Sequence, residues 1–283
     1  MTAPEIVLLG GPDSGKTHYA GQLYGRLQRR PGQLRLRPGE ATPGDLTALQ
    51  EVLGCLEGGR AAQHTPVSTW TEVRLPLIDG RERAMDLSWP DYGGEALRAV
   101  FTGRVVPTPW LERITAAQGW IVLIRLKSEI VYPDKLEQLL QQANAKLASN
   151  AARATAWDAN ARWVELLQLL LHVAGVDTVR RVRQPRLAVV LSCYDELDAG
   201  AQDPAEVLRQ RLPLVSAFLA STWRADQMAV WGLSALGRPL AKDASDAEFM
   251  QDGPEYQGWI MPPRGGASDP DLSRPLAWLL GST

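Results

Sequence analysis

The chain has 283 residues and a formal net charge of -2, with 30 Lys and Arg against 32 Asp and Glu. This length suffices for one large domain or two average ones, and the charge offers no basic surface for nucleic acid or an anionic membrane. Two isolated cysteines favour a reducing cytosol over a disulfide framework, and three scattered histidines lack the spacing of a zinc site. The chain shows no export leader and no apolar run long enough to span a bilayer, so a cytoplasmic location is expected.

Residues 10–17 fit the pattern G-x-x-x-x-G-K-[ST] at every fixed position and directly follow the apolar run at 6–9. A phosphate-binding loop leaves a buried strand in this way and enters a helix whose N-terminal amides face the anion. Lys16 would then reach the β- and γ-phosphates, and the Thr17 hydroxyl would bind magnesium. The alternative is a glycine-rich turn that binds nothing. A helix over 16–30, ended by Pro-Gly, is predicted from the helical spacing of Tyr19, Leu23, Tyr24 and Leu27.

The next stretch carries three local signals. Residues 31–44 are rich in Pro, Gly and Arg and are expected to form a surface connector. Residues 45–56 have leucines at helical spacing, which predicts a helix that ends at a Gly-Gly pair. Residues 60–68 are polar and are expected to form a loop.

Residues 70–77 and 83–89 are partly alternating runs separated by Asp79-Gly80. An Asp-Gly pair between two such runs predicts a β-hairpin with a type I′ turn. Pro76 lacks a backbone N–H, so the first strand of this hairpin is expected to lie at a sheet edge.

Strands and helices alternate through the rest of the chain. Near-continuous apolar runs predict strands buried on both faces at 119–126, 187–191 and 228–233, the last strand of the chain. Helices are predicted at 96–101, 203–219 and 272–280, with a polar helical arm at 127–149 and a Gly/Pro-rich loop at 243–268. A long helix ending near Gly175 is predicted, with an inward stripe of Ala154, Trp157, Ala161, Val164 and Leu171. The pattern predicts an α/β fold with a mostly parallel sheet, one antiparallel hairpin strand and helices on both faces.

Taken in chain order, the motifs resemble those of the Ras-like (TRAFAC-class) P-loop GTPases over residues 5–280. The series is the phosphate loop, a Thr-bearing loop, an antiparallel hairpin, Asp-x-x-Gly, a strand ending in an Asp-containing loop and a strand ending in Ser-Ala. The Pro-Asp-x-x-Gly-Glu form at 90–95 is also similar to that of bacterial double-GTPases associated with conflict systems. The resemblance implies a three-layer P-loop NTPase fold as a single domain over residues 1–283, with insertions at about 31–58, 127–150 and 243–268.

The family pattern implies a magnesium and γ-phosphate site formed by two loops. Thr65 would close on both the metal and the γ-phosphate, Asp91 would hold the metal through water, and the Gly94 amide would bind the γ-phosphate. The expected metal residues are therefore Thr17, Thr65 and Asp91, and the expected nucleotide-binding residues of the phosphate loop are Gly10, Pro12, Asp13, Ser14, Gly15, Lys16, Thr17 and His18.

Asp86 is the alternative to Asp91 as the magnesium aspartate. The hairpin arms decide between them, because paired strands should end near each other. Thr65 to Asp79 is 14 residues and Gly80 to Asp91 is 11, whereas stopping at Asp86 would leave an arm of only 6. These lengths favour Asp91.

In the same pattern Asp195 would pair with two donors on guanine, and the amide of Ala235 would meet the guanine oxygen. Ser192-Cys193 replaces the usual Asn-Lys before that aspartate, which weakens the case for guanine over adenine. The expected base-binding residues are Ser192, Asp195, Ser234, Ala235 and Leu236. The alternative is that the serines and Asp195 only cap strand ends.

Glu95 stands where Ras-like enzymes carry the glutamine that orients the attacking water, and an ionised carboxylate repels phosphate and donates nothing. Pro12 and Asp13 also depart from the small residues of the family loop. Arg60 is either an arginine finger supplied in cis or a solvated loop arginine, and its spacing from Thr65 favours the second. The expected catalytic residues are Lys16, Thr65, Gly94 and Glu95.

These features support a protein that binds GTP or GDP with Mg²⁺ and slowly hydrolyses GTP as a switch for a protein partner. Two alternatives stay open: a nucleotide-binding interaction module without turnover, and a P-loop enzyme that uses ATP. The expected partners are a guanine nucleotide and an effector or activating protein, with no nucleic acid and no membrane insertion.

Overall fold

The computed structural model describes residues 3–11, 13–38, 46–62, 71–91, 100, 103–131 and 158–281. Within these residues eight strands form one sheet in the order β2-β3-β4-β1-β5-β6-β7-β8. The strands are β1 (Glu5–Gly10), β2 (Leu34–Leu36), β3 (Thr71–Asp79), β4 (Ala84–Asp91), β5 (Gly119–Ile124), β6 (Arg186–Ser192), β7 (Met228–Ser234) and β8 (Trp259–Met261).

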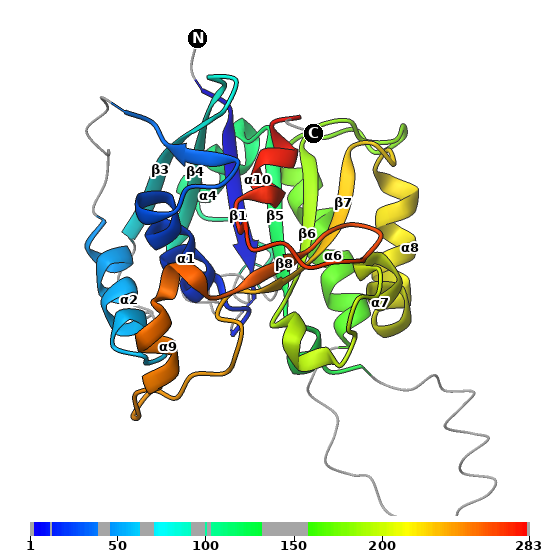
Figure 1. Ribbon diagram of the computed structural model, residues 1–283. Helices are drawn as coiled ribbons and strands as arrows, with labels where there is room; N and C mark the ends of the chain where they lie inside the picture. The colour runs from blue at the N-terminus through cyan, green and yellow to red at the C-terminus, as the bar shows by residue number, and fades with distance from the viewer. Residues whose placement is uncertain are drawn as a thin grey trace, which may run out of the picture.

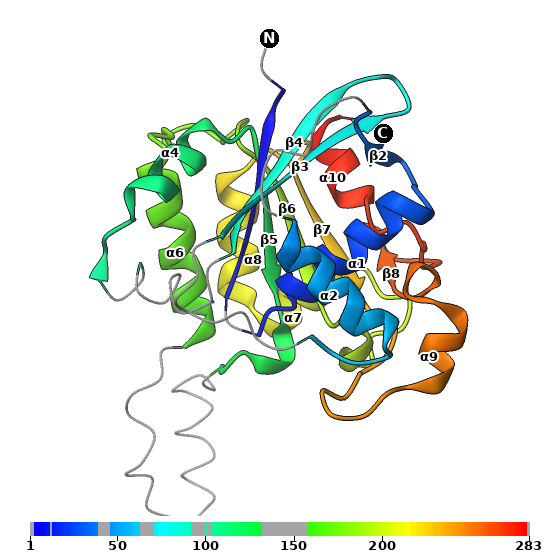
Figure 2. The same ribbon diagram turned by 90° about the vertical axis from the view of Figure 1, so that its left-hand side faces the viewer.

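The helices lie in two layers that enclose the sheet, as the two views at 90° show (Figures 1 and 2). One layer contains α1 (Lys16–Arg29), α2 (Thr47–Glu57), α9 (Ala247–Asp252) and α10 (Arg274–Leu279). The other contains α4 (Thr108–Ala116), α6 (Ala159–Val173), α7 (Pro204–Arg211) and α8 (Pro213–Thr222). Three short 3₁₀ turns are η1 (Leu126–Ser128), η2 (Tyr194–Leu197) and η3 (Pro254–Tyr256).

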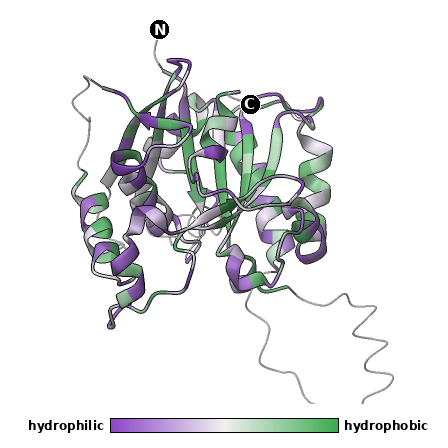
Figure 3. Ribbon diagram, viewed as in Figure 1, coloured by the Kyte–Doolittle hydropathy of each residue, from purple (hydrophilic) through white to green (hydrophobic). Residues whose placement is uncertain are grey.

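The central strands are apolar throughout because both of their faces are covered. On β5, Ile121 and Leu123 face the core on the α1 side, whereas Trp120, Val122 and Ile124 face the core on the α4 and α6 side. Successive side chains of a strand point to opposite faces, so a strand between two helix layers needs apolar residues at every position. Figure 3 shows these strands as the hydrophobic centre of the molecule.

The predicted sheet is confirmed. Strand β1 pairs in parallel with β4 and β5, and β5, β6 and β7 continue the parallel series. Antiparallel pairs join β3 to β4, β2 to β3 and β7 to β8. The carboxyl ends of β1, β5, β6 and β7 therefore meet at one edge of the sheet, where ligands of open α/β sheets bind.

The predicted hairpin is present as β3 and β4, but the predicted type I′ turn is wrong. The turn spans residues 79–83, and its positive φ falls at Glu82 (61°) and not at Gly80. The Asp79 carboxylate accepts hydrogen bonds from two backbone amides inside the turn at 2.8 and 2.9 Å. A carboxylate that holds its own turn stabilises a longer connection than the Asp-Gly pair alone would form.

The prediction that β3 lies at the sheet edge is also wrong, because β2 pairs with its last residues. The pairing ends at Leu36, and the next amide, that of Arg37, donates to the Pro76 carbonyl at 3.0 Å. The N–H and C=O of one strand residue point to the same side, so the donor that Pro76 lacks faces the point where β2 stops. Proline is tolerated there without exposing the whole strand.

Two stretches expected to be loops contribute short strands. The connector at 31–44 contains β2, and the loop at 243–268 contains α9 and β8, so β7 is not the last strand. Both strands have three residues and lie at the ends of the sheet. Their hydrogen bonds come from residues distant in the chain, so the local spacing of apolar residues does not predict these strands.

Proline also divides the helix predicted at 203–219. The structure has α7 and α8 in its place, with Leu212 between them at φ -133° and ψ 70°. Pro213 forces the preceding residue out of the helical region and begins the second helix itself.

The inward stripe predicted for α6 is partly wrong. Ala161 is exposed and Val164 only half-buried, while Leu171 is buried as predicted and Ala154 and Trp157 lie outside the described residues. The helix begins after Asp158, whose carboxylate accepts the amide of Asn160 at 2.9 Å as an N-cap. The observed buried stripe is Ala159, Trp163, Leu166, Leu167, Leu170 and Leu171.

Two glycines on α1 and α2 provide a matched test of the packing between these helices. A Cβ placed on Gly21 would lie 2.3 Å from Val52 Cγ1, whereas one on Gly54 would meet no atom within 4 Å. Gly21→Ala should lower the free energy of unfolding by about 1 to 3 kcal/mol through overpacking. Gly54→Ala should raise it by about 0.5 to 1 kcal/mol, because alanine favours a helix over glycine. Urea denaturation checks both, and equal effects of the two substitutions would contradict the close approach of α1 to α2.

Candidate functional site

The loop between β1 and α1 has a backbone that only glycine permits at two positions. A Cβ on Gly10 would lie 2.6 Å from Ser14 Oγ and 3.1 Å from the Leu123 carbonyl oxygen, so a side chain there has no room. Gly15 has φ 78° and is the N-cap of α1. The first amides of α1 therefore start at the loop, where a helix N-terminus favours an anion.

The side chain of Lys16 folds back across this loop. Its Nζ donates to the carbonyl oxygens of Gly10 at 2.6 Å and Gly11 at 2.8 Å. The Lys16 ammonium thus lies at the end of β1. Thr17, in the first turn of α1, is half-buried. Of the loop residues, Ser14 is buried and Asp13 is exposed with φ 54°.

His18 has a contact that the sequence does not indicate. Its Nε2 accepts a hydrogen bond from the backbone amide of Ala62 at 3.1 Å. The neighbouring amide, of Ala61, donates to the Ala241 carbonyl at 2.9 Å. The imidazole therefore holds the chain at the point where it enters the segment that contains Thr65.

The two candidate magnesium aspartates lie at opposite ends of β4. Asp86 pairs with Glu5, at the start of β1, and its buried carboxylate accepts from Arg37 at 2.7 Å and pairs with Arg74. Asp91 is the last residue of β4, three positions beyond Ser88, which pairs with Val7. Continued, that register sets the backbone of Asp91 level with Gly10.

This placement fits a magnesium site in the type of donor and in position. Mg²⁺ in phosphate sites is held by one or two protein oxygens together with phosphate and water. Thr17 supplies a hydroxyl beside the loop and Asp91 ends a strand at the same edge, whereas Asp86 is already occupied by two arginines. Within the described residues, there is no group of three or more His, Cys, Asp and Glu side chains that could hold a metal ion.

The loop after β6 borders the phosphate loop. Ser192 ends the strand, is 2 % exposed and lies with its Cβ 4.0 Å from the position of a Cβ on Gly15. Its Oγ makes no hydrogen bond within the part of the chain that the structure describes. Cys193 follows in the left-handed region at φ 50°, and Asp195 then lies exposed in η2.

The loop after β7 is held by a side chain of its own and by the chain before β8. Ser234 is buried and its Oγ accepts the amide of Gly237 at 3.1 Å, and Ala235 and Leu236 follow, half-buried. A Cβ on Gly258 would lie 2.3 Å from the Ala235 carbonyl oxygen, so the chain before β8 crosses at close range.

The ring of Tyr194 packs the loop after β6 against the strands β7 and β8. It packs against Gly232, where a Cβ would be 2.7 Å from the ring, and meets Trp259 edge-on with centroids 6.2 Å apart. Its hydroxyl donates to the Gln202 carbonyl at 3.2 Å. The loop after β6 is thus packed against β7, the strand from which the loop with Ala235 leaves.

An ion pair beside these loops was not predicted from the sequence. Arg125 follows β5, and its guanidinium donates from Nε and Nη2 to the two carboxylate oxygens of Glu196 at 3.1 and 2.6 Å. The signal that could have found it is its position, the first residue after a parallel strand at the edge where the other loops gather.

Four of the predicted site residues lie outside the described residues: Pro12, Thr65, Gly94 and Glu95. The structure therefore brings together the phosphate loop, the end of β4 and the two loops after β6 and β7. Arg60 is exposed, and its Nε and Nη2 stand 3.5 Å from the position of a Cβ on Gly58, at the end of α2.

A small apolar cluster connects the loop after β7 with the chain that leads to Thr65. It consists of Val52, Leu56, Ala62 and Phe249, with Cys55, Leu236 and Leu240 packed against it. Phe249 lies on α9 and is fully buried. Leu236 belongs to the Ser-Ala-Leu loop, so this loop and Ala62 pack in the same apolar cluster.

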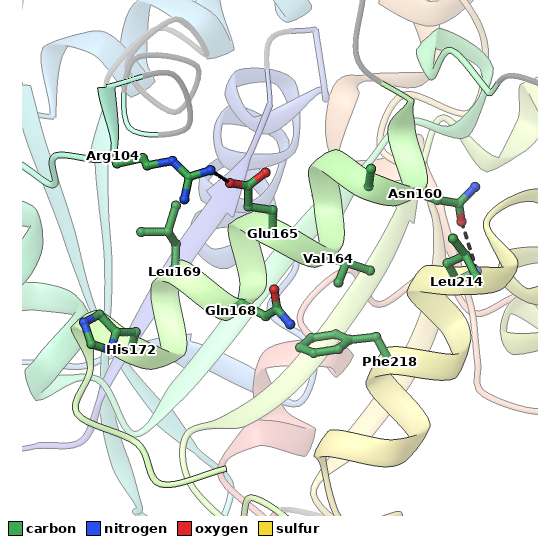
Figure 4. A pocket seen from close by; sticks show the side chains of 10 residues that line it. Arg104, Asn160, Val164, Glu165, Gln168, Leu169, His172, Leu214 and Phe218 are labelled. Atoms are coloured by element: carbon green, nitrogen blue, oxygen red, sulfur yellow. Dashed lines mark hydrogen bonds and ion pairs between the residues drawn. The ribbon is translucent and has the colours of Figure 1, made fainter.

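A separate pocket of ≈670 Å³ lies between α6 and α8, away from the phosphate loop (Figure 4). Leu214 and Phe218 of α8 line one side, and Arg104, paired with Glu165 of α6, lines the other. Among the described residues that line this pocket, no nucleophilic side chain is paired with a general base. We therefore assign no chemistry to the pocket.

Within the described residues, no helix has both the length and the apolar character needed to cross a membrane.

Several solved structures have limited similarity to the chain. A bacterial selenocysteine-specific elongation factor, EF-Sec, has 13% identity and a TM-score of 0.36 over 83% of this chain and 26% of that chain. A signal recognition particle receptor SRb-GTP/SRX complex from Chaetomium thermophilum has 15% identity and a TM-score of 0.40, over 85% of this chain and 94% of that chain. Roco2 RocCORdC of Methanosarcina barkeri bound to GDP has 10% identity and a TM-score of 0.31, over 83% of this chain and 44% of that chain. The chain thus spans about a quarter of the elongation factor's length.

No curated protein sequence matches the chain. The family model described as Double-GTPase 1 matches residues 7–279, which include the phosphate loop from Gly10, the hairpin and both loops after β6 and β7. Because the match covers nearly the whole chain, the chain belongs to the Double-GTPase 1 family.

Proposed function

We propose that this protein binds GTP with Mg²⁺ and hydrolyses it slowly to GDP and phosphate as a switch that a protein partner reads. The observation that carries the proposal is the meeting of the phosphate loop and the loops after β6 and β7 at the carboxyl edge of a series of parallel strands. Membership of the Double-GTPase 1 family supports the guanine nucleotide.

The phosphates would bind at the loop between β1 and α1. The amides of the first turn of α1 favour negative charge, and Gly10 and Gly15 let the backbone approach the anion. Lys16 would exchange its bonds to the carbonyls of Gly10 and Gly11 for bonds to the β- and γ-phosphates.

Thr17, Asp91 and Thr65 would hold the metal. When bound there, Mg²⁺ supplies positive charge to the β- and γ-phosphate oxygens. Thr65 and the Gly94 amide would close on the γ-phosphate and release when it leaves.

The base would lie between the loops after β6 and β7. The exposed Asp195 would accept the two donors of guanine, and the Ala235 amide, flanked by Ser234 and Leu236, would donate to the guanine oxygen. Ser192 takes the position of the family asparagine and lies beside Gly15, where it would brace the phosphate loop.

Unaided turnover would be slow. Glu95 in place of glutamine accepts a bond from water but donates none and repels the γ-phosphate. Arg60 lies at the end of α2 with its head near Gly58, which favours a solvated loop arginine over a finger. An activating partner would therefore supply the missing positive charge.

The switch would be transmitted through the chain that enters the Thr65 segment. Ala62 is tied to His18 of the phosphate-loop helix and packs in the cluster with Phe249 and Leu236. Closure of Thr65 on the γ-phosphate would thus pull on a segment that is already connected to both sides of the nucleotide site.

Two other functions remain as outcomes of the test. Glu95, Pro12 and the Ser-Cys-Tyr-Asp sequence at 192–195 favour a nucleotide-binding module without turnover, and Cys193 in place of lysine favours a relaxed choice of base. Single-turnover assays with labelled GTP and ATP separate them. GTP turnover supports the proposal, GTP binding without phosphate release supports the module, and a preference for ATP supports the third function.

Lys16→Ala should weaken GTP binding on the order of 10- to 100-fold and abolish turnover, because a charge-assisted contact to phosphate is lost. Isothermal titration calorimetry with Mg²⁺ measures the affinity. Lys242→Ala is the matched control, since Lys242 is exposed and is not one of the residues proposed to bind the nucleotide. Equal affinity of the Lys16 and Lys242 variants would remove the phosphate loop from nucleotide binding.

Asp195→Asn should weaken GTP binding by about 10-fold or more and improve binding of xanthosine triphosphate, because the amide presents a donor where guanine also presents one. Asp198→Asn, also exposed and three residues away, should change neither affinity. Competition against a fluorescent GDP analogue gives both constants, and unchanged affinities in the Asp195 variant would place the base elsewhere.

Glu95→Gln should raise the single-turnover rate by roughly tenfold with little effect on GTP affinity, since an amide removes the repulsion of the γ-phosphate and can donate to it. Rapid-quench measurement of released phosphate tests this. A rate equal to that of the parent protein would show that Glu95 has no part in placing water.

A further inference from the structure

Arg125 lies between the two halves of the proposed nucleotide site. In the sheet, β5 stands between β1, which carries the phosphate loop, and β6, which carries the base loop. Arg125 directly follows β5, at the edge where both loops begin. A nucleotide with its phosphates on one loop and its base on the other must pass this residue.

The guanidinium of Arg125 is held by Glu196 of η2. Nε and Nη2 donate to the two carboxylate oxygens at 3.1 and 2.6 Å, and the side chains are only 32 % and 20 % exposed. This fork-to-fork geometry fixes the plane of the guanidinium. Nη1 makes no hydrogen bond within the described residues, so donors remain for a ligand.

Charged groups of both loops act on Arg125. Its hydrogen bond to Glu196 raises its pKa against the opposing effect of burial, and the Asp13 carboxylate acts in the same direction as Glu196. Asp13 belongs to the phosphate loop and Glu196 to the loop after β6. One guanidinium is therefore within electrostatic reach of both.

The loops of the proposed site carry acidic residues and lack the lysine of the family motif. Cys193 stands in the place of that lysine, and burial raises the pKa of its thiol to about 11, so it is neutral at physiological pH and carries no positive charge. Asp13 and Asp195 add two carboxylates, and Glu196 a third that Arg125 pairs. Arg125 is a cation that follows the neighbouring strand β5 and reaches this stretch through its pair with Glu196.

We propose that Arg125 contacts the nucleoside part of the bound nucleotide, in the place that Cys193 leaves open, and that Glu196 is the positioning residue that sets its guanidinium. This inference rests on the proposed function, because it assigns a role within the same site. The free edge of the guanidinium faces the ribose and the adjoining edge of the base, and its charge offsets Asp13.

The test compares GTP and GDP binding by calorimetry in the whole chain with Mg²⁺. Arg125→Ala should lose about tenfold or more in affinity for both nucleotides by the same factor, because the contacted part is common to them. Arg125→Lys should lose less, and Glu196→Gln should lose a part of the effect, since it loosens the fork without removing the cation.

The matched control is Arg104→Ala, which breaks another Arg–Glu pair, with Glu165, on the far helix layer. It should leave both affinities within twofold of those of the parent protein. Thermal unfolding followed by circular dichroism checks that every variant is folded, and Arg125→Lys keeps the test valid should the alanine variant fail to fold.

A second background separates contact from charge balance alone. If Arg125 touches the nucleoside, the loss in Arg125→Ala persists when Asp13 is also changed to Ala. A loss that disappears in Asp13→Ala would make Arg125 only a counter-ion and overturn the inference, as would a loss confined to GTP or unchanged affinities. Failure of the parent protein to bind GTP at all would instead overturn the proposed function.

Discussion

The constraint on which the rest of the site depends is the close turn from β1 into α1. Gly10 leaves the sheet with Ser14 Oγ and the Leu123 carbonyl so near that no side chain fits, and Gly15 enters the helix in a left-handed conformation. This turn fixes the direction of the first amides of α1 relative to the sheet edge. Because β1 is paired in parallel on both sides, the turn cannot shift without disturbing the centre of the fold.

Neighbouring residues lie close to the same turn. Ser192, in the loop after β6, lies beside Gly15, and Lys16 is held by the carbonyl oxygens of the loop itself. Parallel strands end at one edge, so residues that follow β5, β6 and β7 are brought beside it without any further device. The Arg125–Glu196 pair uses this arrangement, because it joins residues that follow two adjacent strands.

The stretches that differ most from the expected pattern pack into the site and not away from it. Helix α9 places Phe249 against Leu56 and Ala62, and the chain before β8 crosses the Ser-Ala-Leu loop at Gly258. An apolar contact of this kind couples two polypeptide segments because neither can move without exposing the shared surface. The proposed switch segment and the proposed base loop thus have a common support.

The sequence by itself determined the elements whose signal is local. The phosphate loop was recognisable because its glycines, lysine and threonine lie within eight residues, and α1 because Tyr19, Leu23, Tyr24 and Leu27 are spaced to share one face, all of which are buried. The central strands were recognisable because a strand covered on both faces needs apolar side chains at every position.

Only the tertiary structure decided what depends on distant partners. The short strands β2 and β8 exist because β3 and β7 supply their hydrogen bonds, and the pair of Arg125 with Glu196 joins residues 71 apart in the chain. Asp86 and Asp91 are the same residue type in one strand. Asp86 pairs with two arginines, whereas Asp91 ends the strand beside the phosphate loop. Such distinctions arise from the register of strands and from packing across the sheet, which short-range spacing does not encode.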